Sequence, residues 1–321
     1  MSAGHPAILT FGPVPSRRLG RSLGINNIPP KACSYSCLYC QVGPSLYKEV
    51  EPREFYPPGE MFEAVQNRIA AVQAQGETID YLTFVPDGEP TLDKRLGETI
   101  ELLRPLDIKI AVISNASLIW RADVQQRLNK VDLVSLKVDT VDEAQWKKIN
   151  QPHKSLQLAN ILQGIKDFAR QYTGELITET MLLADINDSQ AAVSHVADFL
   201  GTIQPSVAYL AIPTRPTAEL AISPPTEDKV VQAYALLAGK LKHVETLIGY
   251  EGNEFAFSGD IEQDILSITA VHPMREDAVN ALLRKAGLDW DVIQTLLDNN
   301  KLKKVVFAGK DYYVRHFSQN Q

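Results

Sequence analysis

Three cysteines are crowded into one short segment, and their side chains are the ones best suited to chemistry. Cys33, Cys37 and Cys40 are the only cysteines in 321 residues, and three and two residues separate them. Thiolates are soft ligands, and a loop wrapped round an iron-sulfur cubane can present three of them to three irons. The fourth iron then lacks a protein ligand, so a small molecule can bind there.

Two simpler interpretations of the cysteines compete with a cluster. Structural zinc needs four ligands, and His153 could supply the fourth. The cysteines could also be buried apolar filler. Neither explains why every cysteine lies in one loop. An odd number of cysteines at this spacing suits ligation in a reducing compartment better than a disulfide framework, so we expect a cytoplasmic protein.

The cysteine spacing, with Tyr39 directly before the third cysteine, resembles the signature of the radical S-adenosylmethionine (SAM) superfamily. The wider stretch from Gly12 to Gly43 is similar to the branch that includes the wyosine-base synthases of tRNA modification and uncharacterised Fe-S oxidoreductases. The resemblance covers roughly residues 11–250. It implies a [4Fe-4S] cluster that binds SAM at its open iron and cleaves it reductively to a 5′-deoxyadenosyl radical. That radical would abstract hydrogen from a substrate, and a flavodoxin-like or ferredoxin-like protein would donate the electron.

The resemblance also assigns cosubstrate contacts to residues that follow expected strands. Gly88-Glu89-Pro90 is similar to the family's Gly-Gly-Glu-Pro element, whose backbone and carboxylate engage the methionine amino group. Asp87 stands where the family often has the first glycine, so the local backbone geometry need not be the same. The other expected SAM contacts are Ser114, Asn115, Ser135 and Ile212, and weaker matches fall on Glu179, Thr214 and Arg215.

Polar and apolar side chains alternate between Val134 and Thr140. In a strand this period of two places Ser135, Lys137 and Asp139 on one face, which in a barrel points inward. Lys137 and Asp139 are therefore candidate catalytic residues. They could form a structural ion pair, or Lys137 could form a Schiff base, because burial lowers a lysine pKa and exposes a nucleophilic amine.

Short runs rich in Val, Ile and Leu alternate with amphipathic stretches, a pattern typical of βα units in a parallel sheet. The expected strands are residues 22–28, 80–85, 108–113, 132–138, 176–183 and 206–212. The expected helices are residues 60–75, 92–103, 121–129, 142–150, 156–172 and 189–203. Six right-handed units predict an α/β fold, a partial (βα)6 TIM-like barrel, with catalytic groups at the carboxyl ends of its strands. A flat doubly wound sheet is disfavoured because no glycine-rich phosphate loop follows the first strand.

A further helix at 227–242 and a β-like run at 244–250 are expected to end the barrel, which we assign to residues 1–258. Residues 259–321 show three short helical patterns and then two β-like runs, 303–307 and 312–317, an order that resembles a winged helix. Winged helices bind nucleic acid or protein, and four lysines cluster at the expected wing. These are Lys301, Lys303, Lys304 and Lys310.

The net charge of −7 argues against a surface-wide nucleic-acid footprint, because phosphate binding needs a basic face. Arg17, Arg18 and Arg21 could meet an anionic substrate or the methionine carboxylate, or form a solvated loop. His272 shows no paired metal spacing, so we expect it to be structural or exposed. No apolar stretch reaches the roughly 20 residues of a membrane helix, and the N-terminus lacks the order of a secretory signal.

The leading hypothesis is an enzyme, and the alternative is a zinc- or Fe-S-sensing regulator that binds nucleic acid.

Overall fold

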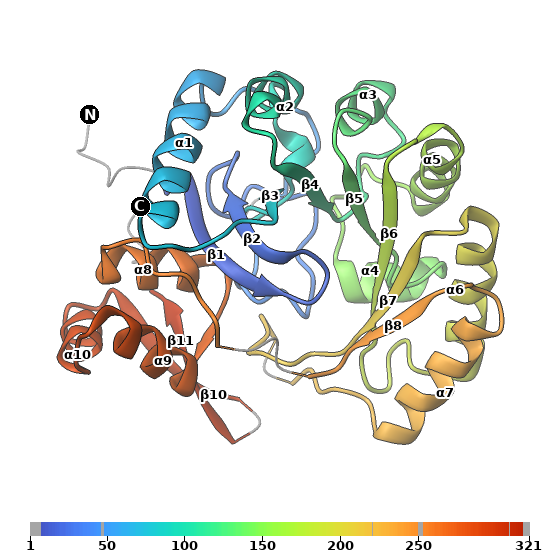
Figure 1. Ribbon diagram of the computed structural model, residues 1–321. Coiled ribbons are helices and arrows are strands. Elements are labelled where there is room, and N and C mark those ends of the chain that lie inside the picture. Colours follow the sequence, from blue (N-terminus) through green and yellow to red (C-terminus); the bar gives the residue numbers. More distant parts are fainter. Residues whose placement is uncertain (1–7, 46–47, 220, 250–252, 308, 317–321) are drawn as a thin grey trace.

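An eight-stranded sheet that curls without closing forms the centre of the molecule (Figure 1). The computed structural model describes residues 8–45, 48–219, 221–249, 253–307 and 309–316. The strands follow one another across the sheet in chain order. They are β1 (Thr10–Ser16), β2 (Gly20–Ile25), β3 (Tyr81–Phe84), β4 (Lys109–Ser114), β5 (Leu133–Lys137), β6 (Glu175–Met181), β7 (Val207–Ala211) and β8 (Val244–Leu247).

All six expected strands are present as β2 to β7, and they pair in parallel. The expected count of six is too low, because β8 pairs in parallel with β7 and extends the sheet. At the other edge β1 pairs with β2 in antiparallel fashion. β1 contains Pro13 and Pro15, which cannot donate to a neighbouring strand and so suit an edge position. Tyr250, at the end of the expected run 244–250, lies outside the described residues.

Helices cover the outer face of the curved sheet, as Figure 1 shows for α1, α2, α3, α5, α6 and α7. Their apolar faces form one large core with the strands. In α5, Ile161, Ile165 and Phe168 recur at helical spacing and are buried in this core. The helices are α1 (Pro58–Ala74), α2 (Leu96–Leu103), α3 (Ala122–Leu128), α4 (Glu143–Asn150), α5 (Leu158–Gln171), α6 (Gln190–Ile203) and α7 (Glu227–Ala238), with short 3-10 turns at Pro90–Leu92 and Arg104–Leu106.

The C-terminal part of the chain has a second apolar core of its own. Its elements are α8 (Ile261–Val271), β9 (Met274–Arg275), α9 (Glu276–Ala286), α10 (Asp291–Asp298), β10 (Leu302–Phe307) and β11 (Lys310–Arg315). The three strands form a small sheet in the order β10-β11-β9. Ala308 and Phe317 of the expected hairpin lie outside the described residues. We call the segment from α8 to β11 the C-terminal unit.

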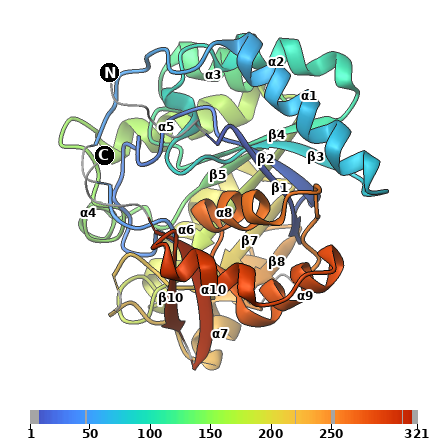
Figure 2. The ribbon, with the colours of Figure 1, turned by 90° about the vertical axis from the view of Figure 1, so that its left-hand side faces the viewer.

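The C-terminal unit packs against the first edge of the large sheet, and Figure 2 shows α8 beside β1. A buried ion pair joins the C-terminal unit to the large domain: Arg68 of α1 contacts Asp264 of α8 at 2.6 Å. Asp264 is completely buried and also accepts bonds from the backbone and hydroxyl of Ser258 at 2.7 Å. Arg68 Nε in turn donates to the Gly12 carbonyl at 2.7 Å. Three segments distant in the sequence therefore meet at one charge pair.

Among the described residues, no helix combines the length and the apolar character needed to cross a lipid bilayer.

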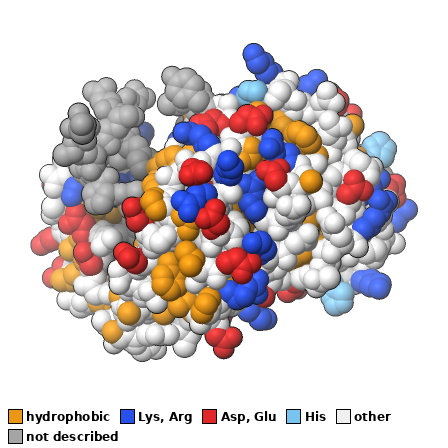
Figure 3. Space-filling model, turned by 90° about the horizontal axis from the view of Figure 1, so that it is seen from above, with side chains coloured by type: hydrophobic (Ala, Val, Ile, Leu, Met, Phe, Trp, Pro, Cys, Tyr) orange, Lys and Arg blue, Asp and Glu red, His pale blue; other side chains and the backbone are white. Residues whose placement is uncertain are grey.

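One face of the molecule, seen from above in Figure 3, carries Lys and Arg side chains interspersed with Asp and Glu. Both signs of charge therefore alternate on this face.

Replacing Arg68 with Met is expected to destabilise the protein by about 3–5 kcal/mol, because Asp264 is left as an uncompensated buried charge. The free energy of unfolding from urea denaturation measures this. Arg170→Met is the matched control, since Arg170 and Asp167 form an exposed pair on α5 whose loss should cost at most about 1 kcal/mol. Equal effects of the two substitutions would contradict the structural role of the buried pair.

Candidate functional site

A cavity of about 320 Å³ lies inside the curled sheet, and all three cysteines line it. The thiols come from the loop after β2, and loops and strand ends from β3 to β7 supply many of the other polar groups. The expected site residues that line the cavity are Cys33, Cys37, Cys40, Tyr39, Gly88, Ser114, Asn115 and Lys137. Loops that follow parallel strands meet at one edge of a sheet, which explains why residues so distant in the sequence come together.

Backbone hydrogen bonds to neighbouring elements hold the cysteine loop. Ser36 N donates to the Asn150 carbonyl at 3.0 Å, and Leu38 N donates to the Ile149 carbonyl at 2.9 Å, so the loop rests on the end of α4. On the other side, Glu89 N donates to the Ala32 carbonyl at 3.0 Å. The loop is therefore fixed at both ends of the cysteine motif.

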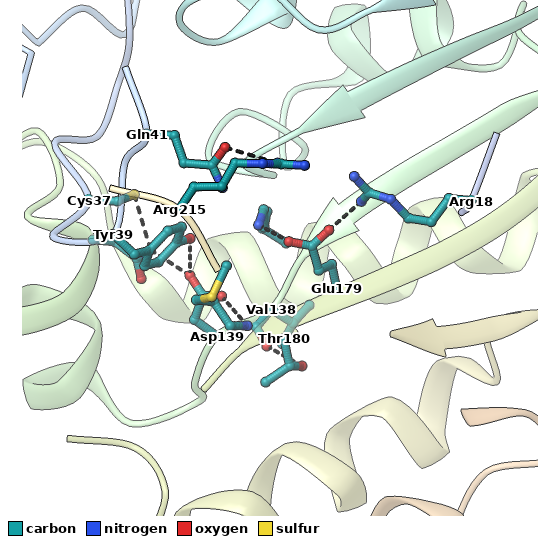
Figure 4. Close-up of polar contacts among 12 residues, drawn as sticks. Arg18, Cys37, Tyr39, Gln41, Val138, Asp139, Glu179, Thr180 and Arg215 are labelled. Carbon is teal, nitrogen blue, oxygen red and sulfur yellow. Dashed lines mark hydrogen bonds and ion pairs between the residues drawn. The ribbon is translucent and has the colours of Figure 1, made fainter. Parts of the chain in front are cut away.

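The aromatic residue of the motif has a specific partner. The Tyr39 hydroxyl donates to Asp139 Oδ2, and Asn150 donates to the same oxygen at 2.8 Å (Figure 4). Asp139 Oδ1 accepts a bond from Met181 N at 3.0 Å. Lys137 contacts Glu179 instead of Asp139, so the ion pair between Lys137 and Asp139, one of the two alternatives for these residues, is wrong.

Two side-chain amides donate hydrogen bonds to cysteine sulfurs. Asn115 Nδ2 lies 3.6 Å from Cys33 Sγ, and Asn150 Nδ2 lies 3.4 Å from Cys37 Sγ. Burial raises the pKa of all three thiols, that of Cys37 to about 12. Thiolates in such a place need both hydrogen-bond donors and a compensating positive charge, which iron supplies when it binds. The donor set and its amides therefore fit an iron-sulfur cluster.

His153, the residue suggested as a fourth ligand for structural zinc, is engaged elsewhere. Its Nδ1 lies 2.8 Å from the Ser155 hydroxyl, and the side chain is not buried. Within the described part of the chain, no three His, Cys, Asp or Glu side chains form a group that could hold a single metal ion.

The segment after β3 packs tightly against the cysteine loop. A Cβ atom added at Gly88 would lie 2.0 Å from the Ala32 carbonyl oxygen, so only glycine fits. Glu89 is completely buried and is not among the residues that line the cavity. Its carboxylate accepts from the Thr91 hydroxyl at 2.6 Å, the Ser114 hydroxyl at 2.8 Å and Asn115 N at 2.7 Å. In this structure Glu89 joins β3 to β4.

Lys137 contacts Glu179, and Arg18 contacts the other oxygen of the same carboxylate (Figure 4). The register of β5 and β6 places Lys137 directly opposite Glu179. Burial raises the pKa of Glu179, but Lys137, Arg18 and Arg215 outweigh it and lower that pKa to about 2. Glu179 is therefore a buried carboxylate that stays charged.

The three N-terminal arginines have different surroundings. Arg18 lines the cavity. Arg17 donates to the carbonyls of Thr246 and Gly249 at 3.3 and 2.7 Å, and Arg21 pairs with Glu77. Of the candidates for an anion contact, only Arg18 reaches the site.

Four further residues belong to the site although sequence reasoning missed them or gave them little weight. Arg215 lines the cavity and donates to Gln41 at 3.2 Å, and Asn150 reaches Cys37 as described above. Val271 and His272, at the end of α8, also line the cavity. His272 is buried, and its isolated position in the sequence carried no signal that it faces the cysteines. The C-terminal unit thus forms part of the cavity wall.

Several expected SAM contacts lie behind the cavity surface. Ser135 and Pro90 are buried, Ile212 is partly buried against the large core, and none of them lines the cavity. Thr214 accepts a bond from the Tyr312 hydroxyl at 3.0 Å through its carbonyl. The roles assigned to these residues and to Glu89 stay predictions.

Comparisons with known proteins agree with this geometry. The chain is 49% identical over 311 residues to a UPF0026 protein of Methanocaldococcus jannaschii, with 96% of each chain covered. A radical SAM methyltransferase from Sphaerobacter thermophilus has a similar fold, with 14% identity, a TM-score of 0.55, and 71% of this chain and 66% of that one covered. TYW1 with a bound lysine-pyruvate adduct gives 14% identity, a TM-score of 0.53, and coverage of 69% and 74%.

A family model provides the assignment. The model of the radical SAM superfamily matches residues 27–195, a segment that begins before the cysteine loop and ends in α6. The match includes all three cysteines, Gly88, Lys137 and Glu179. Together with the close UPF0026 relative, it shows that the chain belongs to the radical SAM superfamily.

Proposed function

We propose that Cys33, Cys37 and Cys40 hold a [4Fe-4S] cluster at which this enzyme cleaves SAM, and that the cavity holds the substrate from which hydrogen is abstracted. One observation carries the proposal: the three thiols line a single cavity together with polar groups from the ends of β3 to β7. Superfamily membership implies the cluster and SAM in general terms. A flavodoxin-like or ferredoxin-like protein is the proposed electron donor.

When bound, the cluster supplies the electron that splits the carbon-sulfur bond of SAM and so generates a carbon radical. The protein contributes orientation and the exclusion of water. Gly88 permits the close backbone approach of the segment after β3 to the cysteine loop, and Asn115 and Asn150 orient Cys33 and Cys37 through their sulfurs. Ser114 and Asn115 lie at the cavity surface, where they can bind the polar groups of SAM.

Lys137 serves in this proposal as a charged anchor in contact with Glu179. Its Nζ also lies 5.1 Å from the centre of the Tyr39 ring, over the cysteine loop. A Schiff base, the alternative suggested by the wyosine resemblance and by the lysine-pyruvate adduct in TYW1, would require Lys137 to leave Glu179.

The substrate is proposed to be an RNA base or a small molecule that is modified in a reducing, cytoplasmic compartment. The regulator alternative receives no support from the comparisons, because the similar folds named above are those of enzymes.

We also propose that the C-terminal unit is a winged-helix-like domain beginning near Gly259, as its order of helices and hairpin suggests. Two of its four clustered lysines are already paired with carboxylates. Lys304 pairs with Asp311 at 2.7 Å, and Lys301 pairs with Glu262 at 2.6 Å. Because Val271 and His272 line the cavity, closing the chamber is the better supported role of this unit.

Cys37→Ala is expected to abolish deoxyadenosine formation when anaerobically reconstituted protein is reduced in the presence of SAM. Wild-type protein should carry about four irons per chain. Ser36→Ala, in the same loop, is the control and should retain both iron and SAM cleavage. Cleavage that survives Cys37→Ala, or wild-type protein that holds stoichiometric zinc without iron, would overturn the proposal.

Treating the reconstituted protein with pyruvate and borohydride is expected to leave Lys137 unmodified, because its amine contacts Glu179. Mass spectrometry of the peptide that contains Lys137 measures this. A reduced pyruvate adduct on Lys137 that is missing from a Lys137→Arg variant would show the Schiff base instead.

Charge reversal of Lys303 and Lys304 to Glu is expected to leave the salt-dependent binding of tRNA and duplex DNA unchanged, since Lys304 already has carboxylate partners. Fluorescence anisotropy at two salt concentrations measures the binding. A loss of affinity with a smaller salt slope would show that the wing contacts nucleic acid.

A further inference from the structure

One length of chain lies along the cysteine loop on a side away from the cavity. Leu38 N donates to the Ile149 carbonyl at 2.9 Å, and His153 N donates to the Ser34 carbonyl at 2.9 Å. The chain from the end of α4 to His153 therefore follows the loop, and Figure 1 shows α4 below β5, apart from the helices of the outer layer. None of these four residues lines the cavity. We call residues 147–154 the covering segment.

The covering segment connects a thiol to the surface of the protein. Asn150 Nδ2 lies 3.4 Å from Cys37 Sγ. The three residues that follow, Gln151, Pro152 and His153, are partly exposed. Asn150 thus contacts one of the proposed cluster ligands and is directly followed by residues at the surface. The path from the surface to Cys37 on this side is therefore short.

The two segments that meet here contain no acidic residue. Residues 22–48, which include the cysteine loop, and residues 144–166, which include the covering segment, together carry six lysines and no Asp or Glu. The whole chain, in contrast, has 39 Asp and Glu against 32 Lys and Arg. The six lysines are Lys31, Lys48, Lys147, Lys148, Lys154 and Lys166.

Four of the six lysines lie on or beside the covering segment. Lys148 and Lys154 are exposed, and no described residue forms an ion pair with either. Lys48 Nζ donates to a backbone carbonyl of the segment at 3.0 Å. Lys147 is exposed and pairs with Glu143 at 2.8 Å. The segment therefore presents several ammonium groups to solvent within a few residues of Asn150.

Acidic side chains approach this surface at three places. Glu143 pairs with Lys147 as described. Glu49 is compensated by Arg53, which donates to it at 2.9 Å. Glu219 is exposed, and its backbone N donates to the Leu38 carbonyl at 3.1 Å. The four lysines thus face two uncompensated or shared glutamates, and the surface stays positive in a chain whose net charge is −7.

We propose that the covering segment is the docking surface of an acidic one-electron carrier protein, which passes its electron through Asn150 and Cys37 to the cluster. This rests on the proposed function, because an electron is needed only if the thiols hold a cluster. Redox partners form small, transient interfaces, and complementary charge speeds their encounter. The carrier is oxidised by one electron and the cluster is reduced by one, and no proton or chemical group is transferred.

The cavity side of the loop does not suit this partner. In the proposed function SAM and the substrate occupy the cavity, and Val271 and His272 of the C-terminal unit form part of its wall. A carrier on the covering segment reaches the same thiols from the other side. Electron delivery and substrate binding would then take place at separate surfaces.

The test measures how fast two acidic carriers, bacterial flavodoxin in its hydroquinone form and reduced bacterial ferredoxin, reduce the cluster-loaded protein. The cluster absorption is followed by stopped-flow spectroscopy. Replacing Lys148 and Lys154 with Glu is expected to slow reduction by a carrier roughly tenfold or more at low ionic strength and to flatten its salt dependence, because the steering charge is reversed. Photoreduced deazariboflavin, a small uncharged reductant, should reduce the variant as fast as the wild type.

The matched control replaces Lys240 and Lys242 with Glu and so changes the net charge by the same amount. Both lysines are exposed and precede β8, whereas the cysteine loop follows β2, so they lie at the opposite edge of the parallel sheet. The control should be reduced by the carriers at the wild-type rate. Equal slowing of the two double variants would show an effect of net charge alone and would overturn the docking surface.

The remaining outcomes separate this proposal from the proposed function. An unchanged carrier rate in the Lys148 and Lys154 variant, or failure of both carriers to reduce wild-type protein that cleaves SAM with deazariboflavin, would overturn the docking surface and leave the proposed function intact. Slower reduction by deazariboflavin as well would place the effect at the cluster and also overturn it. Protein without iron would instead refute the proposed function. Iron content and melting temperature check each variant, and Lys154→Glu alone, with an expected slowing of about threefold, carries the test if the double variant does not fold.

Discussion

The carboxylate of Asp139 is the junction on which the arrangement of the site depends. It connects the cysteine loop through Tyr39, the end of α4 through Asn150 and the end of β6 through Met181 N. Asn150 also donates to Cys37 Sγ, so one set of bonds determines where a thiol lies relative to the sheet. The loop that carries the cysteines has no regular secondary structure of its own. Its geometry therefore depends on hydrogen bonds to neighbouring elements such as these.

Much of the barrel could be predicted because periodicity is a local property. The apolar runs of β2 to β7 and the amphipathic helices between them are visible in windows of about 10 residues. The two edges are different. β1 contains two prolines and an irregular register, so only its pairing with β2 defines it as a strand of the sheet. The β-like run at 244–250 predicted β8, but not that β8 extends the parallel sheet beside β7.

The sequence predicted which residues carry the thiols, but it predicted less well which side chains contact one another in the site. The cysteine spacing and the inward face of β5 can be read from consecutive residues. The partner of Lys137 cannot, because it depends on the register that sets β5 against β6 and brings Glu179 opposite. Asp139, two residues away in the sequence, was the natural but wrong choice. His272 carried no signal, since its place in the cavity follows from the docking of α8 on β1.

The docking of α8 also bears on how the chamber exchanges its contents with solvent. Because the C-terminal unit supplies part of the wall, the chamber widens when α8 separates from β1. That separation would break the buried contact between Arg68 and Asp264, so it would carry the cost of leaving Asp264 as an unpaired buried charge. Reactive carbon species formed beside this wall would be shielded from quenching by the medium on the side that Val271 and His272 cover.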